Sequence, residues 1–312
     1  TQPALPDLED FIPYLRQIWE NKILTNNGPF QKQLEKELAE YLGVPYISLF
    51  ANGSLALLTA LQVMRIGGEV ITTPYTFFAT GGSISRLGAR PVFVDIDPKT
   101  YILDPAKVAG AVGRRTRAII PVHLFGQCAD MDAILAAAKK IPVIEDAAQA
   151  IGATYKGRKA GTMGLFGCFS FFPSKNLGGA GDGGFITTND PALAERLTIL
   201  REHGSKPKYY HSVIGINSRL DALQAAIVLV KLPHLERWHQ GRRRNAAFYT
   251  RALSGAPVVP PFIREDCESI FNQYVIRAPR RDALREHLAK TGLGTEVYYP
   301  VPLHLQKCYA FL

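Results

Sequence analysis

Short apolar runs alternate with helix-like segments between about residue 30 and residue 190 of this chain. The apolar runs lie at 46–50, 69–73, 91–95, 118–122 and 142–145, and the helix-like segments lie at 31–42, from 53 onward, and at 79–87, 105–112 and 130–139. This rhythm is typical of βαβ units, in which crossover helices join parallel strands. Because the runs are apolar almost throughout, we expect both faces of each strand to be buried. The pattern predicts an α/β fold with a mostly parallel sheet sandwiched between helices.

The pattern changes after residue 150. Shorter strands are expected at 167–172 and 184–188, followed by a helix at 191–203. Ser218 and Asp221 are spaced as a capping box, which predicts the start of a long helix. That helix is expected to break at Pro233 and to run towards residue 250.

Length and composition place the chain among ordinary globular proteins. Its 312 residues are enough for two domains or one large one, and a change in composition near 254–257 predicts a large domain at 1–250 and a smaller α+β domain at 251–312. An apolar fraction of 47% and a charged fraction of 20% exclude disordered and collagen-like chains. No run of about 18 uncharged apolar residues predicts a membrane span, and the first residues do not resemble a signal peptide.

The spacing of the cysteines and the distribution of charge indicate which metals and macromolecules the protein is not expected to bind. The four cysteines lie far apart and form no C-x-x-C pair, so we expect reduced thiols in the cytoplasm and no zinc knuckle. The net charge of +9 is spread along the chain, and its densest run is 242–244. A nucleic-acid-binding protein usually gathers such charge in a patch or a known module. We therefore expect neither nucleic acid nor membrane as a partner, but a surface that favours small anions.

Lys175 is the first candidate for chemistry. It follows an aromatic strand at 169–172 and precedes a glycine-rich segment at 178–184. Burial there would lower the pKa of the amine and make it nucleophilic, as a Schiff-base lysine requires. The ordinary alternative is a solvated loop lysine.

Asp146 is the second candidate, because Glu145 and Asp146 follow a buried strand. Ligands of open α/β sheets gather at the carboxyl ends of the strands. A carboxylate at that edge can pair with a protonated heteroaromatic nitrogen, as pyridoxal 5'-phosphate (PLP) requires. Alternatively, the two acids only interact with the N-terminus of a helix. The residues alone favour neither interpretation.

Two further segments suit a flat, phosphorylated ligand. Gly53 and Ser54 lie at a strand-to-helix turn, where free N–H groups can bind one phosphate. Simple helix capping is the alternative there. Phe77 lies in an aromatic cluster at 74–80 and could stack on a flat ring, although such aromatics more often belong to the core.

Together with the spacing from Ser170 to Lys175, these motifs strongly resemble the DegT/DnrJ/EryC1/StrS family of PLP-dependent sugar aminotransferases of fold type I. The resemblance extends from residues 24–29 to residues 298–305. It implies that Lys175 carries the cofactor, that Asp146 faces its pyridine nitrogen and that Gln149 lies near its ring hydroxyl. It also implies roles for residues that stack on the ring or bind the phosphate: Phe77, Gly53, Ser54, Ser170 and Asn217.

In the family, the asparagine matched by Asn217 reaches the phosphate of the neighbouring subunit. The resemblance therefore implies a homodimer with a shared active site. Chains of the family normally continue some tens of residues past the segment matched by 303–306, so the small domain is expected to be incomplete here. No H-E-x-x-H pattern occurs, and no catalytic metal is expected.

The implied reaction moves an amino group from glutamate to a ketone of a nucleotide-linked deoxysugar. Some relatives carry histidine in place of the lysine and act as dehydratases, whereas Lys175 favours amino transfer. Residues 173–184 and 295–300 resemble enzymes that aminate C3, whereas 25–30 and 48–53 resemble enzymes that aminate C4. We favour C3, because the lysine segment lies beside the reacting carbon.

Residues expected to contact the substrate are Tyr210, His211, Arg219, Tyr299 and His304. Arg219 suits a diphosphate, because its guanidinium can donate two parallel hydrogen bonds. Equally, it could be a surface arginine paired with Asp221 or Glu202. Two remoter functions remain: a non-catalytic PLP-binding regulator, and a nicotinamide-dependent dehydrogenase, whose glycine fingerprint is not matched at 178–184.

Overall fold

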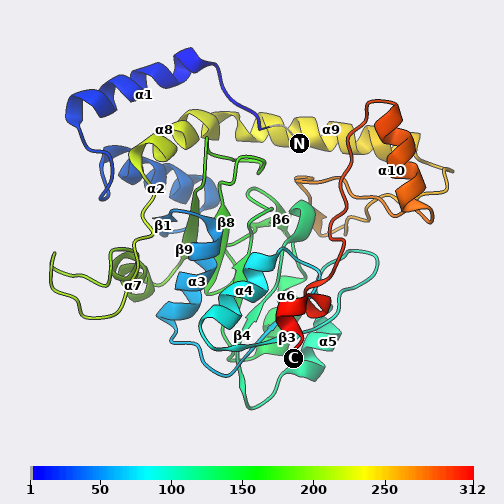
Figure 1. Cartoon of the computed structure of the whole chain (residues 1–312), viewed down its shortest axis with the longest axis horizontal. Coiled ribbons are helices and arrows are strands. Elements are labelled where there is room, and N and C mark those ends of the chain that lie inside the picture. The colour runs from blue at the N-terminus through cyan, green and yellow to red at the C-terminus, as the bar shows by residue number, and fades with distance from the viewer. Residues whose placement is uncertain (1–2) are drawn as a thin grey trace.

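A computed structural model describes residues 3–312. Two groups of strands, β1-β9-β8-β5 and β3-β2-β4, continue into one another through parallel bridges from Ile119 to Val143 and from Val122 to Asp146. The strands are β1 (Tyr46–Phe50), β2 (Glu69–Thr72), β3 (Arg90–Phe93), β4 (Thr116–Ile120), β5 (Ile144–Asp146), β8 (Phe166–Ser170) and β9 (Gly184–Thr188). They form the central sheet of the protein (Figure 1).

Most neighbouring strands of this sheet are parallel. β2 pairs in parallel with β3 and β4, and β5 pairs in parallel with β8. Only β9 runs in the opposite direction, because it is antiparallel to both β1 and β8. The mostly parallel α/β sheet predicted from the alternating pattern is confirmed.

Helices cover both faces of the sheet, as the layers in Figure 1 show. One buried cluster joins one face to α1 (Leu8–Asn21), α2 (Pro29–Leu42), α5 (Pro105–Ala111), α6 (Met131–Ala138) and α8 (Ala222–Lys231). The other joins the opposite face to α3 (Gly53–Val63), α4 (Phe78–Arg86) and α7 (Pro191–Arg201). Alternate strand residues serve the two clusters, as strand geometry requires: Ile71 belongs to the first and Val70 to the second.

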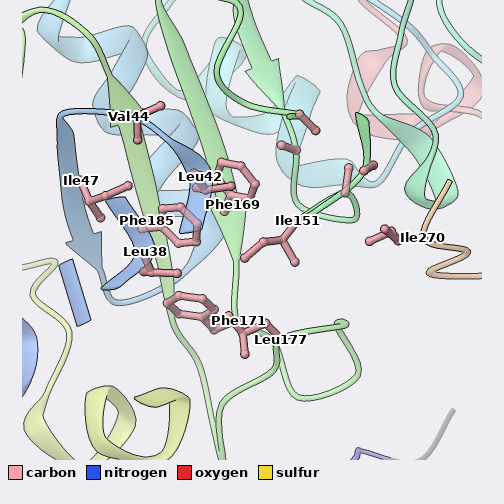
Figure 2. Close-up of a cluster of buried hydrophobic side chains, with 14 of the residues drawn as sticks. Leu38, Leu42, Val44, Ile47, Ile151, Phe169, Phe171, Leu177, Phe185 and Ile270 are labelled. Carbon is pink, nitrogen blue, oxygen red and sulfur yellow. The ribbon is translucent and has the colours of Figure 1, made fainter. Parts of the chain in front are cut away.

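Aromatic side chains fill the first cluster where β8 meets β9. The rings of Phe169 and Phe185 are stacked, with centroids 4.3 Å apart, and Phe171 packs beside them (Figure 2). All three are fully buried. This packing makes the end of β8 a rigid base for the segment that follows it.

The long helix begins later than the proposed capping box. Asp221 caps α8, since its Oδ1 accepts a hydrogen bond of 2.7 Å from the Gln224 amide. Ser218 does not take part, and its buried hydroxyl has no partner within residues 3–312. Its backbone instead bonds Arg201 and Ala51. The capping box was therefore wrong, whereas the break at Pro233 is confirmed.

Beyond α8 the chain passes a short 3-10 turn, η2 (Leu232–His234), and enters α9 (Leu235–Ala252). The remaining elements are β10 (Cys267–Glu268), α10 (Arg281–Lys290), η3 (Leu303–Leu305) and η4 (Lys307–Tyr309). β10 pairs with a hairpin made of β6 (Thr154–Tyr155) and β7 (Arg158–Lys159). Its position ties the segment after α9 to the large domain, and the division at residue 250 stays a prediction.

The segment from residue 298 onward lies against α4 and the loop before it. Tyr75 donates a hydrogen bond to the Tyr298 carbonyl, and the Leu303 amide donates one of 2.9 Å to the Pro74 carbonyl. Figure 1 shows this stretch running down to the region of α4 and β3. None of the helices in the described part of the chain has the length and apolar character needed to cross a membrane.

Candidate active site

The predicted site residues meet at the carboxyl ends of β5 and β8. Asp146 ends β5, Ser170 ends β8, and the two strands pair in parallel. Gly53 begins α3, and a Cβ atom placed on it would lie 2.9 Å from the Ser170 Cβ. Segments far apart in the sequence thus share the sheet edge where ligands of α/β proteins bind.

Asp146 is buried, with only 5% of its surface exposed. Its Oδ2 accepts a hydrogen bond of 2.7 Å from the Thr80 hydroxyl, and its Oδ1 accepts one of 3.2 Å from the Ala148 amide. Burial raises the pKa of Asp146, while these two hydrogen bonds and the positive charge of Lys175 act in the opposite direction. The carboxylate is oriented at both oxygens and is sensitive to any positive charge placed beside it.

Lys175 lies in a tight turn after β8, where its amide donates a hydrogen bond of 2.8 Å to the Phe172 carbonyl. Burial lowers the pKa of its amine, and the negative charge of Asp146 opposes this effect. Within residues 3–312 the amine forms no ion pair with a carboxylate closer than 4 Å. A partly desolvated lysine facing a buried acid differs from the solvated loop lysine that was the alternative.

Glu145 has a different role from its neighbour. Its carboxylate accepts hydrogen bonds from His123 Nε2 (2.7 Å) and from the amides of Gly161, Met163 and Gly164 (2.6–2.7 Å). His123 Nδ1 accepts from a backbone amide, so Nε2 carries the proton that it donates to Glu145. No helix follows β5 directly, because the chain passes through turns at 147–153 into β6, and the interpretation of both acids as helix N-terminal residues was wrong.

Gln149 connects the sheet edge at Asp146 to two aromatic residues, Tyr75 and Tyr299, which form an aromatic wall. Its Oε1 accepts a hydrogen bond of 2.7 Å from the Phe125 amide, in the turn η1 (Leu124–Gly126). Its Nε2 donates a longer one of 3.5 Å to the Tyr299 hydroxyl. Tyr75 meets Tyr299 edge to face, with ring centroids 6.0 Å apart. Burial raises the pKa of Tyr75 to about 12, so this phenol stays neutral at physiological pH.

Tyr299 was expected to contact the substrate, and it belongs to this wall. Burial raises the pKa of its hydroxyl strongly. The hydrogen bond from Gln149 acts in the opposite direction, and the negative charge of Asp146 adds to the rise. The hydrogen bond from Gln149 connects Tyr299 to the edge of the sheet where Asp146 lies. It presents a neutral hydroxyl that can donate or accept.

The turn at Gly53 has the features of an anion site. Asn52 caps α3 through a hydrogen bond of 2.9 Å from the Leu55 amide, while Ser54 is exposed. A side chain at Gly53 would also come within 3.2 Å of the Phe169 carbonyl, so the close approach of this turn to β8 requires glycine. An amine, an acid, a flat aromatic and this helix N-terminus together fit the donor set of a phosphorylated pyridine such as PLP.

Several predicted residues have side chains that are exposed in the single chain. Phe77 is 62% exposed at the start of α4, and Tyr210 is 72% exposed. The side chains of His211, His304 and Asn217 are also exposed. No contact in the structure tests their predicted roles.

Arg219 lines a cavity of about 290 Å³ together with Asn52, Asp182 and Asp221. Its Nε is buried and has no hydrogen-bond partner in the described chain. Neither Asp221 nor Glu202 forms an ion pair with it across residues 3–312, and Glu202 pairs with Arg201 at 3.5 Å. The alternative of a paired surface arginine was therefore wrong.

Thr80 and Tyr75 contact the site and were not identified from the sequence as functional residues. Both lie in the aromatic segment at 74–80, where only Phe77 stood out. Thr76 lies just before α4 and Thr80 in its first turn, but nothing in the sequence connects these hydroxyls with Asp146. Within residues 3–312 no group of three or more His, Cys, Asp or Glu side chains could hold a metal ion.

Known proteins resemble this chain over most of its length. A model of the DegT/DnrJ/EryC1/StrS aminotransferase family matches residues 7–312. A pleiotropic regulatory protein from Geobacillus stearothermophilus is 55% identical over 292 residues, which cover 91% of this chain and 78% of that protein. A UDP-2-acetamido-2-deoxy-3-oxo-D-glucuronate aminotransferase from Pseudomonas aeruginosa is 46% identical over 287 residues, covering 91% and 80%.

The fold has a close match among solved structures. The structure of S. venezuelae DesV in complex with a ketimine intermediate has a TM-score of 0.94 at 39% identity. The match covers 99% of this chain and 87% of that one. The fold type I architecture expected from the sequence is confirmed.

Proposed function

Because this chain belongs to the DegT/DnrJ/EryC1/StrS aminotransferase family, we propose that it uses PLP to move an amino group from glutamate to a nucleotide-linked ketosugar. We further propose a deoxysugar with its keto group at C3. One observation supports the chemistry most directly: Lys175, whose pKa burial lowers, follows β8, and the buried Asp146 ends the neighbouring parallel strand β5. An amine of lowered pKa beside an oriented acid is what such a reaction needs.

The residues that would hold the cofactor come from several elements. Asp146 would face the pyridine nitrogen, Lys175 would carry the group covalently, and Gln149 would lie near the ring hydroxyl. The ring would stack on Phe77, and Gly53, Ser54 and Ser170 would bind the phosphate. When bound, PLP supplies an electron sink for negative charge at the donor's α-carbon.

The chain's own contribution is proton transfer and orientation. The Lys175 amine is free of any carboxylate ion pair in the described chain and has a lowered pKa, so it can accept and return the α-proton of the donor. Asp146 would keep a proton on the pyridine nitrogen through its negative charge. Tyr75 and Tyr299 would exclude water from one side of the pocket, because their rings meet edge to face.

We also propose that the working unit is a homodimer with a shared site. Asn217 is exposed on the segment between α7 and α8, and its side chain forms no hydrogen bond with the site residues within residues 3–312. The same segment exposes large apolar side chains: Tyr209, Tyr210, Val213 and Ile214, the last at 90%. A second subunit would bury them and receive Asn217 at its phosphate site. The free cysteines, three of them buried, support a reducing compartment such as the cytoplasm.

The choice of C3 depends on the lysine segment. Residues 173–184 resemble C3-aminating enzymes and lie at the proposed reaction centre, and the similar Pseudomonas aeruginosa protein is named for a 3-oxo sugar. Residues 25–30 and 48–53, which resemble C4-aminating enzymes, keep amination at C4 as the second candidate. The similar Geobacillus stearothermophilus protein carries a regulatory name, so a PLP-binding regulator is the third.

A spectral titration separates these candidates. Purified protein is loaded with PLP, converted with glutamate, and then mixed with dTDP- or UDP-linked 3-keto or 4-keto sugars. We expect glutamate to remove the visible band of the bound cofactor and only a 3-keto sugar to restore it. Restoration by a 4-keto sugar would mean that the N-terminal resemblance determines the substrate. A band that never turns over with any sugar would favour the regulator, and no band at all would exclude the proposal.

A further inference from the structure

We propose that Thr80, supported by Thr76, is a positioning residue that keeps Asp146 ionised and aimed at the pyridine nitrogen of the cofactor. This inference rests on the proposed function, because it assigns a task to side chains around the proposed PLP site. It concerns two hydroxyl groups that no motif identified. Thr80 lies in the first turn of α4, and Thr76 lies just before the helix, in the segment 74–80 that also contains Phe77.

The three side chains form a buried hydrogen-bonded relay. Thr80 Oγ1 lies 2.7 Å from Asp146 Oδ2, and Thr76 Oγ1 lies 2.9 Å from Thr80 Oγ1. The exposed fractions are 0% for Thr80, 4% for Thr76 and 5% for Asp146. Since these groups are buried away from water, each hydroxyl is expected to donate its proton to another member of the relay.

The ionisation of Asp146 determines the direction of this relay. A charged carboxylate can only accept, so Thr80 donates its single proton to Asp146. Thr76 must then donate to Thr80, and the negative charge orients both hydroxyls. If Asp146 were protonated, it could donate to Thr80 and reverse both bonds. A bound pyridinium ring would favour the first arrangement, because it needs an acceptor with a negative charge.

The hydroxyl of Thr80 behaves differently from an ordinary helical threonine. Thr198 in α7 donates to the carbonyl four residues earlier, at 3.1 Å, which is the usual local bond. Thr80 instead donates its hydrogen bond to the carboxylate of Asp146, 66 positions away in the sequence. A local structural role would not require that contact. The relay therefore links α4 to the end of β5 at the side chain that meets the cofactor.

The position of the relay at the start of α4 places it beside other parts of the proposed site. Tyr75, one residue before Thr76, is tied to the Tyr298 carbonyl. Ser83, one turn after Thr80, donates a long hydrogen bond of 3.4 Å to the Ser54 carbonyl at the proposed phosphate turn. The same short segment thus reaches the acid, the phosphate turn and the aromatic wall.

The test uses three variants of the full chain, each loaded with PLP labelled with ¹⁵N at the ring nitrogen. Thr80→Val removes the donor at nearly constant volume, and Thr80→Ser keeps it. Thr59→Val is the matched control, because Thr59 is also fully buried and its hydroxyl has no partner within residues 3–312. The readouts are the ¹⁵N chemical shift against pH, the Kd for PLP and the split between kcat and KM.

We expect Thr80→Val to lower the pH midpoint of ring-nitrogen protonation by about one unit and to weaken PLP binding about tenfold. The value of kcat should fall about tenfold with little change in KM for the sugar, whereas Thr80→Ser and Thr59→Val should stay near the wild type. If wild type and both controls bind PLP but Thr80→Val shows an unchanged ¹⁵N midpoint, the inference is wrong. If the wild type itself binds no PLP, the proposed function fails first.

Discussion

Glu145 and Asp146 are neighbours in β5, yet their carboxylates serve opposite sides of the sheet. Glu145 accepts four hydrogen bonds from His123 and from backbone amides at 161–164. Asp146 accepts two and interacts with Lys175. The alternation of a strand therefore separates a structural acid from a functional one.

Glu145→Gln should weaken folding. The new amide group would place its own donor against an amide or imidazole donor, leaving a buried group unpaired. We expect the free energy of unfolding to fall by about 3 kcal/mol, measured by urea denaturation. The bound cofactor's spectrum should remain in whatever fraction stays folded, and a variant as stable as the wild type would contradict the structural role.

Asp146→Asn should have the opposite profile. Burial raises the pKa of Asp146 in the folded protein above its ordinary value, so its ionisation costs stability once the pH exceeds that ordinary value. The variant without cofactor should therefore be at least as stable as the wild type at pH 7, and the difference should vanish below about pH 4. Transamination should fall by about 10² to 10³. Parallel urea titrations at pH 4 and pH 7, with rate assays, test both parts.

The reactivity of Lys175 should depend on pH in a way that reports its environment. Since burial lowers the pKa of its amine, PLP should be captured with a pH midpoint below the ordinary lysine value of 10.5. The charge of Asp146 opposes this shift, so Asp146→Asn should lower the midpoint further. Stopped-flow capture rates between pH 6.5 and 10 measure it. A midpoint that rises in Asp146→Asn would argue against the interaction of the two groups.

Lys175→Ala should abolish transamination and leave the fold intact, because the rigid aromatic base of β8 does not include the lysine side chain. Single-turnover assays and thermal unfolding followed by circular dichroism test the two halves of this expectation. Lys36→Ala provides the control, since Lys36 lies on the exposed face of α2. Activity retained in Lys175→Ala would remove the basis of the proposed mechanism.

Mixed dimers test the shared site. One chain carries Lys175→Ala and the other Asn217→Ala, so both changes fall in one site if Asn217 serves its neighbour. The second site is then wild type, and the mixed dimer should retain about half of the wild-type rate. Co-purification with two affinity tags followed by rate assays provides the measurement. Should the rate equal half that of the Asn217→Ala homodimer, Asn217 would act within its own chain.

Local sequence patterns predicted most of the strands and helices. The strands at Tyr46–Phe50 and Gly184–Thr188 have the predicted bounds, because each is a clear run rich in apolar and β-branched residues. The helix α1 was not predicted: Pro13 inside it is a residue that usually breaks a helix, and only Ile18 of its residues is buried. The reversed direction of β9 was also not predicted, because residue alternation carries no information on strand direction.

The site was predictable where it follows the sheet and not where it depends on packing between distant segments. Asp146 and Lys175 follow strands, so their position at a ligand-binding edge could be inferred. The contact between Thr80 and Asp146 arises only when α4 packs against the sheet, and no local pattern encodes that register. Arg219 was ambiguous because its alternatives differ only in tertiary contacts.

The contacts made by residues 298–299 also impose an order of events during synthesis. Every strand of the central sheet lies before residue 190, whereas the hydroxyl that Gln149 meets arrives 150 positions after it. At a translation rate of roughly 5–20 residues per second, that delay is about 8 to 30 seconds. During this interval a nascent chain on the ribosome can assemble its sheet while the aromatic wall is still missing. Until residues 298 and 299 have been synthesised, Tyr75 and Gln149 have neither of these two partners.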